Sequence, residues 1–156
     1  MNKYLLIAAV IGAVITDPAP VAAHEPLLNK QDVPQAVLAA FQKDHPTVKR
    51  VKYEEEVIDG KEAYEIAYFD EKGQERSEVY SADGTLVETE KVIKIDELPD
   101  SVSQAVKNTH PRATLQRAFQ VSNTSGTVTS YEVEIREGKK EREVEFDPNG
   151  KILSRC

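Results

Sequence analysis

The stretch from Asp32-Val33-Pro34 to His45-Pro46 decides the fold of this chain, because a stretch of the same design runs from Glu97-Leu98-Pro99 to His110-Pro111. The apolar residues and prolines of the two stretches correspond at a constant offset of 65 residues. Such self-similarity is an internal repeat, and it indicates where structural units begin. Residues that recur in both copies are therefore expected to have structural rather than catalytic roles.

Each of the two stretches predicts a short amphipathic helix, because its apolar residues recur at helical spacing. Pro34 and Pro99 mark the helix starts, since the first turn does not need the N–H that proline lacks. The proline of each His-Pro pair marks a helix end, because proline disfavours the helical conformation in the residue before it. His45 and His110 are therefore expected to be the last or capping residues of their helices.

Beyond each His-Pro pair the spacing changes to an alternation of apolar and polar residues, which is typical of half-buried strands. Tyr64, Ile66 and Tyr68 show this alternation in the first copy, and residues 131–135 show it in the second. Turns such as Asp59-Gly60 separate the strands, since these residues tolerate positive φ. The predicted strands lie near residues 49–58, 62–69, 74–81, 85–94, 114–122, 129–136, 140–146 and 151–155.

The sequence thus predicts an α+β fold of two tandem units, each with one helix packed on an antiparallel sheet of about four strands. No linker rich in proline, glycine or serine separates the units, so we expect one continuous sheet with both helices on one face. The expected organisation is a signal peptide at residues 1–23, a first repeat at residues 24–95 and a second repeat at residues 96–156.

The N-terminal residues have the pattern of a secretory signal. The apolar run from Tyr4 to Ile15 is too short to cross a bilayer, which needs roughly 20 apolar residues. Val21-Ala22-Ala23 places small residues where a signal peptidase reads them, so cleavage after Ala23 would leave His24 as the mature N-terminus. We therefore expect a soluble periplasmic or extracellular protein that does not insert into a membrane after cleavage.

Charge and cysteine content narrow the class of partner. The net charge of −7 argues against nucleic acid as a partner. Cys156 is the only cysteine and cannot pair within the chain, so stability must come from burial of apolar surface. The terminal thiol is interpreted as unimportant, with an intermolecular disulfide as the alternative.

The sequence offers little for catalysis or metal binding. It contains no Gly-x-Ser-x-Gly motif and no glycine-rich phosphate loop, so we predict no enzyme activity and no cofactor. His45 and His110 are interpreted as helix caps. A histidine near a helix C-terminus can hydrogen-bond to the last carbonyl groups of the helix, and the helix dipole favours its cation. The alternative is a copper or zinc site in which the amine and imidazole of a mature N-terminal His24 act with His45 or His110.

Carboxylates are abundant in the predicted strands. Because residues two apart on a strand share a face, these carboxylates predict a charged ridge on the side of the sheet away from the helices. Phe69 is the large apolar residue that the alternation exposes there, and an acidic face with an aromatic residue suits a basic patch of another protein. The candidate partner-binding face consists of Lys52, Glu54, Glu56, Glu65, Phe69, Glu132, Glu134 and Arg136.

These motifs together resemble tandem PepSY-like domains. The resemblance is carried by the apolar-Pro pairs, the helices closed by His-Pro, the Tyr-Glu-Ile and Tyr-Glu-Val strands, and the closing Gly turns before Leu86 and Ile152. The family is the beta-lactamase-inhibitor-like group of small exported bacterial proteins, and the resemblance covers the chain beyond the signal. It implies a helix on an antiparallel sheet, a periplasmic or extracellular address and no catalysis. Related folds resemble an inhibitor that presses the open face of its sheet on a target enzyme. The resemblance names no target and transfers no functional residues.

The resulting functional hypothesis is a non-catalytic interaction module that binds another exported protein, as an inhibitor or a sensor of an enzyme in the same compartment. Two alternatives remain open. One is a copper- or zinc-binding protein that uses His24, and the other is an envelope structural or stress protein without a single ligand.

Overall fold

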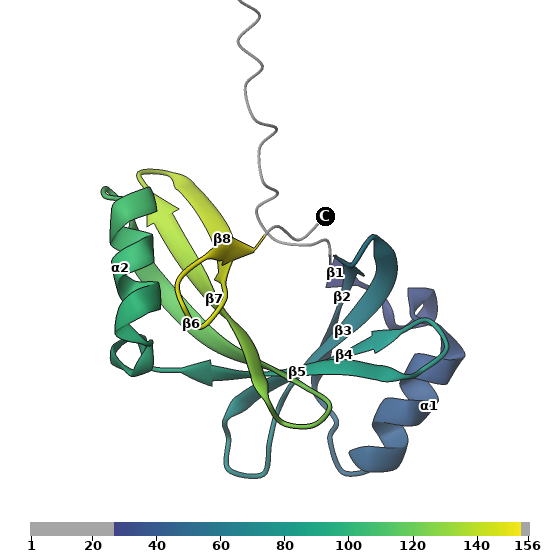
Figure 1. The fold of residues 1–156 in the computed structure, drawn as a ribbon. Helices are drawn as coiled ribbons and strands as arrows, with labels where there is room; N and C mark the ends of the chain where they lie inside the picture. Colours follow the sequence, from purple (N-terminus) through teal and green to yellow (C-terminus); the bar gives the residue numbers. More distant parts are fainter. Residues whose placement is uncertain (1–26, 154–156) are drawn as a thin grey trace, which may run out of the picture.

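The computed structural model describes residues 27–153. The predicted signal peptide with its cleavage site, His24 and Cys156 therefore lie outside the described residues. Within the described range, neither helix combines the length and apolar character needed to span a bilayer. The elements follow in the order β1 (Leu27–Leu28), η1 (Lys30–Asp32, a 3-10 helix), α1 (Gln35–Asp44), β2 (Val51–Ile58), β3 (Lys61–Phe69), β4 (Glu75–Ser81), β5 (Leu86–Ile93), η2 (Ile95–Glu97, a 3-10 helix), α2 (Asp100–Thr109), β6 (Thr114–Asn123), β7 (Val128–Glu137), β8 (Lys140–Phe146) and β9 (Ile152–Leu153) (Figure 1).

All nine of these strands belong to one antiparallel sheet in which each strand pairs with its neighbours along the chain. The prediction of two tandem helix-on-sheet units is therefore wrong. The pairing of β5 with β6 overturns it, because six residue pairs, from Glu88↔Asn123 to Ile93↔Ala118, continue the ladder across the expected boundary. A long ladder at this position is favoured because an unpaired edge of β5 would leave a row of backbone groups exposed.

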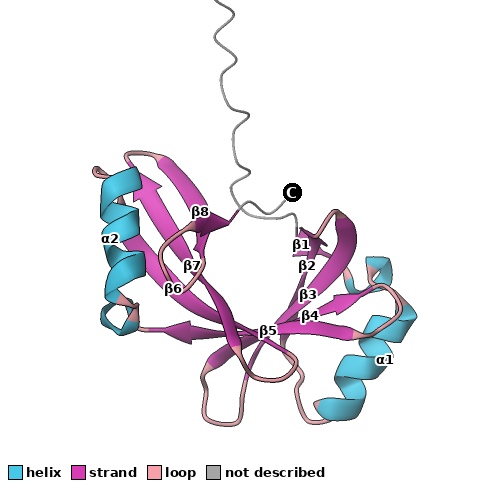
Figure 2. Ribbon diagram, viewed as in Figure 1, coloured by secondary structure: helices cyan, strands magenta, loops and turns pink. Residues whose placement is uncertain are grey.

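The sheet is strongly curled, and both helices lie on its outer side (Figure 2). The pairing register shifts between Val79 and Tyr80 in β4, and again between Leu115 and Arg117 and between Val121 and Ser122 in β6. A β-bulge increases the local right-handed twist and bends the strand that carries it. The bulges in the central strands account for the curl.

Two hydrophobic clusters fill the space between the helices and the sheet. In the first, Val33, Val37 and Phe41 pack on buried residues of β3 and β4, which are Tyr64, Ile66, Tyr68 and Tyr80. In the second, Leu98, Val102 and Val106 pack on buried residues of β6, β7 and β8, which are Ala118, Val133, Ile135 and Phe146. The apolar spacing predicted from the sequence therefore marks the buried stripe of each helix correctly.

The helix ends have matching geometry. Pro34 and Pro99 are the N-cap residues, one position earlier than expected. His45 and His110 are the C-cap residues, and their backbone N–H groups donate to the carbonyls of Phe41 and Val106, at 2.8 Å in each case. The capping position predicted for the two histidines is confirmed, although the contact runs through the backbone rather than through the ring.

Two glycine turns lie close against the helices. Gly84 has φ +82°, and a Cβ added there would stand 2.6 Å from the carbonyl oxygen of Ala36. Gly150 has φ +83°, and a Cβ there would stand 2.5 Å from the carbonyl oxygen of Ser101. Glycine is required at both positions for its positive φ and for the close backbone approach.

Candidate partner-binding face

The inner side of the curled sheet, which we call the concave face, carries the side chains that point away from the two clusters. Residues that pair directly across two strands share a face, so the pairing register shows which residues lie on the concave face. Glu54 pairs with Glu65, and Glu132 pairs with Glu145. Carboxylates outnumber basic residues on this face. Its carboxylates are Glu54, Glu56, Glu65, Glu75, Glu88, Glu90, Glu132, Glu134, Glu141, Glu143 and Glu145, and its basic residues are Lys52, Lys61, Arg117 and Arg136.

All the residues of the predicted partner-binding face lie on the concave face, but they differ in exposure. Phe69 is 60% exposed, whereas Glu56 and Glu132 are 8% and 3% exposed. Lys52 and Arg136 are exposed, and the remaining members, Glu54, Glu65 and Glu134, are half-buried. The predicted charged ridge is therefore not exposed along its whole length, since an outside partner cannot directly reach Glu56 and Glu132.

The curl explains this burial. Val79 and Val121 also point to the concave face, and both are fully buried. In a flat sheet such residues would face water on the side opposite the helices. Because the sheet wraps around its own inner side, the central strands shield one another, and alternation alone cannot reveal this.

Arg117 of β6 organises a cluster on the concave face that the sequence analysis missed. Its Nη2 atom lies 2.8 Å from Oε2 of Glu75, and its Nη1 atom lies 3.4 Å from Oε1 of Glu134. The guanidinium also stands over the ring of Phe119, with Cζ 4.6 Å from the ring centroid. Alternation through residues 114–122 places Arg117 and Phe119 on one face, and this was the available signal.

Exposed apolar side chains interrupt the acidic surface of the concave face. Leu27 is 65% exposed, Phe69 is 60% exposed and Val92 is 38% exposed. Leu27 pairs with Glu54, while Val92 pairs with Phe119 beside Arg117. Exposed apolar groups rimmed by charge are typical of surfaces that bind other proteins.

The two histidines do not form a joint site. Nε2 of His45 lies 2.8 Å from Oε1 of Glu78, whereas Nδ1 of His110 lies 3.8 Å from Oε1 of Glu137. Each histidine thus has its own carboxylate at its own helix end. Among residues 27–153, no group of three histidine, cysteine or acidic side chains is placed to hold a metal ion.

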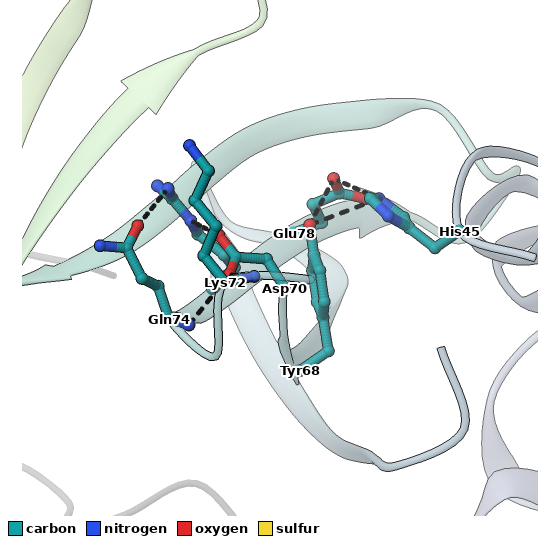
Figure 3. A network of polar contacts seen from close by, with 7 residues as sticks. His45, Tyr68, Asp70, Lys72, Gln74 and Glu78 are labelled. Atoms are coloured by element: carbon teal, nitrogen blue, oxygen red, sulfur yellow. Dashed lines mark hydrogen bonds and ion pairs between the residues drawn. The ribbon is translucent and has the colours of Figure 1, made fainter. Parts of the chain in front are cut away.

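Glu78 is the centre of a half-buried network on the helix side of the sheet (Figure 3). It accepts hydrogen bonds from His45, from the hydroxyl of Tyr68 at 3.3 Å and from the hydroxyl of Tyr80. Burial raises the pKa of both tyrosines above the ordinary value of 10.0, and the Glu78 carboxylate adds to the rise. The tyrosines therefore stay neutral hydrogen-bond donors, which suits packing rather than acid–base catalysis.

A family match accompanies this fold. The chain belongs to the family described as "Putative beta-lactamase-inhibitor-like, PepSY-like", whose model matches residues 62–154, more than half of the chain. No curated protein matches the sequence.

Solved structures from three Bacteroides species share the fold. A protein from Bacteroides eggerthii described as "putative periplasmic" is 16% identical, with a TM-score of 0.56 over 78% of this chain and 86% of that chain. A DUF2874 family protein from Bacteroides uniformis is 20% identical, with a TM-score of 0.55 over 78% and 87% of the two chains. A DUF2874 family protein from Bacteroides ovatus is 17% identical, with a TM-score of 0.53 over 78% and 85%. At these identities the likeness establishes the fold alone.

Proposed function

We propose that this protein is a non-catalytic interaction module of the periplasm or the extracellular space, which binds a basic surface of another exported protein through its concave face. The observation that carries the proposal is the combination of exposed Phe69 and Val92 with the surrounding carboxylates of that face. The family description and the periplasmic description of the Bacteroides eggerthii relative support both the class and the compartment.

The charge of the concave face selects the chemistry of the partner. Complementary charge steers association and suppresses wrong partners, so a lysine- or arginine-rich surface fits this face. The protein as a whole has a net charge of −7, which also favours a basic partner over nucleic acid. The exposed apolar groups supply area that can be buried, which charge alone does not provide.

The accessible residues should make the contacts, and the buried ones should support them. Glu65 and Phe69 lie on the same face of β3, separated by Ala67. Glu56 and Glu132 are too buried to touch a partner, so they contribute only to the electrostatic potential of the concave face. An inhibitor and a sensor would use the same surface, and they differ in what the partner does once it is bound.

Charge reversal at Glu65 tests the proposal. The mature protein is used to capture partners from periplasmic extract, the captured protein is identified by mass spectrometry, and the purified pair is titrated by calorimetry. We expect Glu65→Lys to weaken binding at least tenfold. Phe69→Ala should also weaken binding, but it should leave the salt dependence of the affinity unchanged. The melting temperatures of both variants should equal that of the wild type. Asp44→Lys, an equal charge change at the end of α1, is the control and should bind normally. Equal weakening by Glu65→Lys and Asp44→Lys, or none by either, would refute the proposed face.

A further inference from the structure

The helix side of the sheet has a groove between the two hydrophobic clusters, which we call the outer groove. It has a volume of about 370 Å³, at the lower end of the range for small-molecule sites. Its floor is a row of cross-strand partners that runs from Tyr68 through Arg76 and Lys91 to Gln120. The groove is lined by Tyr68, Arg76, Ser77, Glu78, Thr89, Glu90, Lys91, Gln120, Ser122 and Gly126.

Two cations face each other across the floor of this groove. Arg76 of β4 pairs directly with Lys91 of β5, and like charges in this position destabilise a sheet. The Nε atom of Arg76 lies 3.1 Å from the carboxylate of Asp70, and its Nη2 atom donates a hydrogen bond to the amide oxygen of Gln74 at 3.0 Å. Lys91 is half-buried, and its side chain makes no hydrogen bond or ion pair within residues 27–153. The ammonium group of Lys91 therefore has no ion-pair partner in the described part of the chain.

The remaining polar groups of the groove offer donors. The side chains of Thr89 and Gln120 also make no hydrogen bond to the described part of the protein. Two glutamates line the groove. Glu78 already accepts hydrogen bonds from His45, Tyr68 and Tyr80, whereas Glu90 pairs with Ser77 and Val121, so its side chain points to the concave face. Ammonium, amide and hydroxyl donors thus converge on the helix side of the sheet, and this combination suits an oxyanion.

We propose that the outer groove binds a small molecule through a carboxylate or phosphate group placed between Arg76 and Lys91, with Thr89 and Gln120 donating to its oxygens. The anion relieves the repulsion between the two cations. This site lies on the opposite side of the sheet from the concave face, so it does not depend on the proposed partner.

Nuclear magnetic resonance titration of the protein with inorganic phosphate and, separately, with succinate at constant ionic strength tests the site. We expect saturable shifts of the Thr89, Lys91 and Gln120 amides with at least one anion, and the anion that binds more tightly identifies the ligand class. Lys91→Gln should lower that affinity at least tenfold. The matched control Lys107→Gln removes an equal charge from the exposed surface of α2 and should change the affinity less than twofold.

A second variant keeps the test decisive if Lys91→Gln folds poorly. Gln120→Glu places a carboxylate directly opposite Lys91, so it should abolish anion binding and raise the melting temperature. Absence of saturable shifts with both anions, equal loss of affinity in Lys91→Gln and Lys107→Gln, or unchanged binding by Gln120→Glu would each overturn the proposal.

Discussion

Nε2 of His45 lies 2.8 Å from Oε1 of Glu78, which ties the end of α1 to the centre of β4. An ionised carboxylate can only accept, so this imidazole nitrogen carries the proton. The side chains of His45 and Glu78 are 23% and 13% exposed, so water screens the contact only partly. His110 holds the same position on α2, but its ring stands 3.8 Å from Glu137, beyond hydrogen-bond distance.

Replacing His45 by alanine should therefore cost more stability than the same change at His110. Loss of a hydrogen bond to a charged group is worth about 1.5 to 3 kcal/mol, and His45→Ala also removes the ring contacts with Phe41 and Tyr68. For His110→Ala we expect about 0 to 1 kcal/mol, because its ring is too far from Glu137 for a hydrogen bond. Urea unfolding at neutral pH measures both values. Equal losses in the two variants would show that the contact with Glu78 adds nothing.

Stability should fall at alkaline pH, with a contribution from Tyr64. The hydrogen bond that its hydroxyl donates to Glu62, together with burial, raises the pKa of Tyr64 to about 12, against 10.0 for an ordinary tyrosine. Between these values the unfolded chain loses the proton while the folded chain keeps it, so stability is complete below pH 10 and declines above it.

Glu62→Gln tests this origin of the shift. The variant should bring the pKa of Tyr64 back towards its ordinary value, because its largest cause is removed. It should then lose less stability than the wild type between about pH 9 and about pH 11, measured by urea unfolding with tyrosinate absorbance as the second probe. Glu71→Gln, at an exposed turn residue, should behave as the wild type does. A loss in Glu62→Gln as large as in the wild type would contradict the assignment.

Local features of the fold were predictable from the sequence because they depend on neighbouring residues. The spacing of Val37 and Phe41 identified the buried stripe of α1, and the His-Pro pairs identified both helix ends. The two-residue strand β1 and the 3-10 helices η1 and η2 were missed, since two or three residues carry no periodic signal.

The absence of a linker indicated one continuous sheet, but the residue pairing of its central strands and the burial of the candidate face were not predictable in this way. The ladder between β5 and β6 joins Glu88 to Asn123, and no local pattern encodes a contact at that separation. Alternation placed Glu132 on the correct face, but its 3% exposure depends on a curl produced by bulges in other strands. Arg117 was overlooked because its importance comes from Glu75, which lies two strands away.

Gly84 should tolerate alanine far less well than Gly73. Both have positive φ, at +82° and +73°, so both variants pay roughly 1 to 2 kcal/mol for the left-handed backbone. A Cβ at Gly73 meets open space, whereas a Cβ at Gly84 would stand 2.6 Å from the carbonyl oxygen of Ala36. Gly84→Ala should thus lower the melting temperature clearly more than Gly73→Ala in thermal unfolding. Similar losses would mean that the turn moves away from α1 without cost.

The continuous sheet predicts that the protein unfolds in one transition. Val37 of α1 and Val102 of α2 are both fully buried on the sheet-facing sides of their helices. Each valine-to-alanine change leaves a cavity and should cost about 1 to 3 kcal/mol. Because the ladder between β5 and β6 joins the two ends of the sheet, either variant should lower the midpoint of the same single transition, seen by circular dichroism and by tyrosine fluorescence. If Val37→Ala instead split the curve into two steps while Val102→Ala shifted only one of them, the ends of the sheet would be unfolding independently, and the β5–β6 ladder would be too weak to couple them.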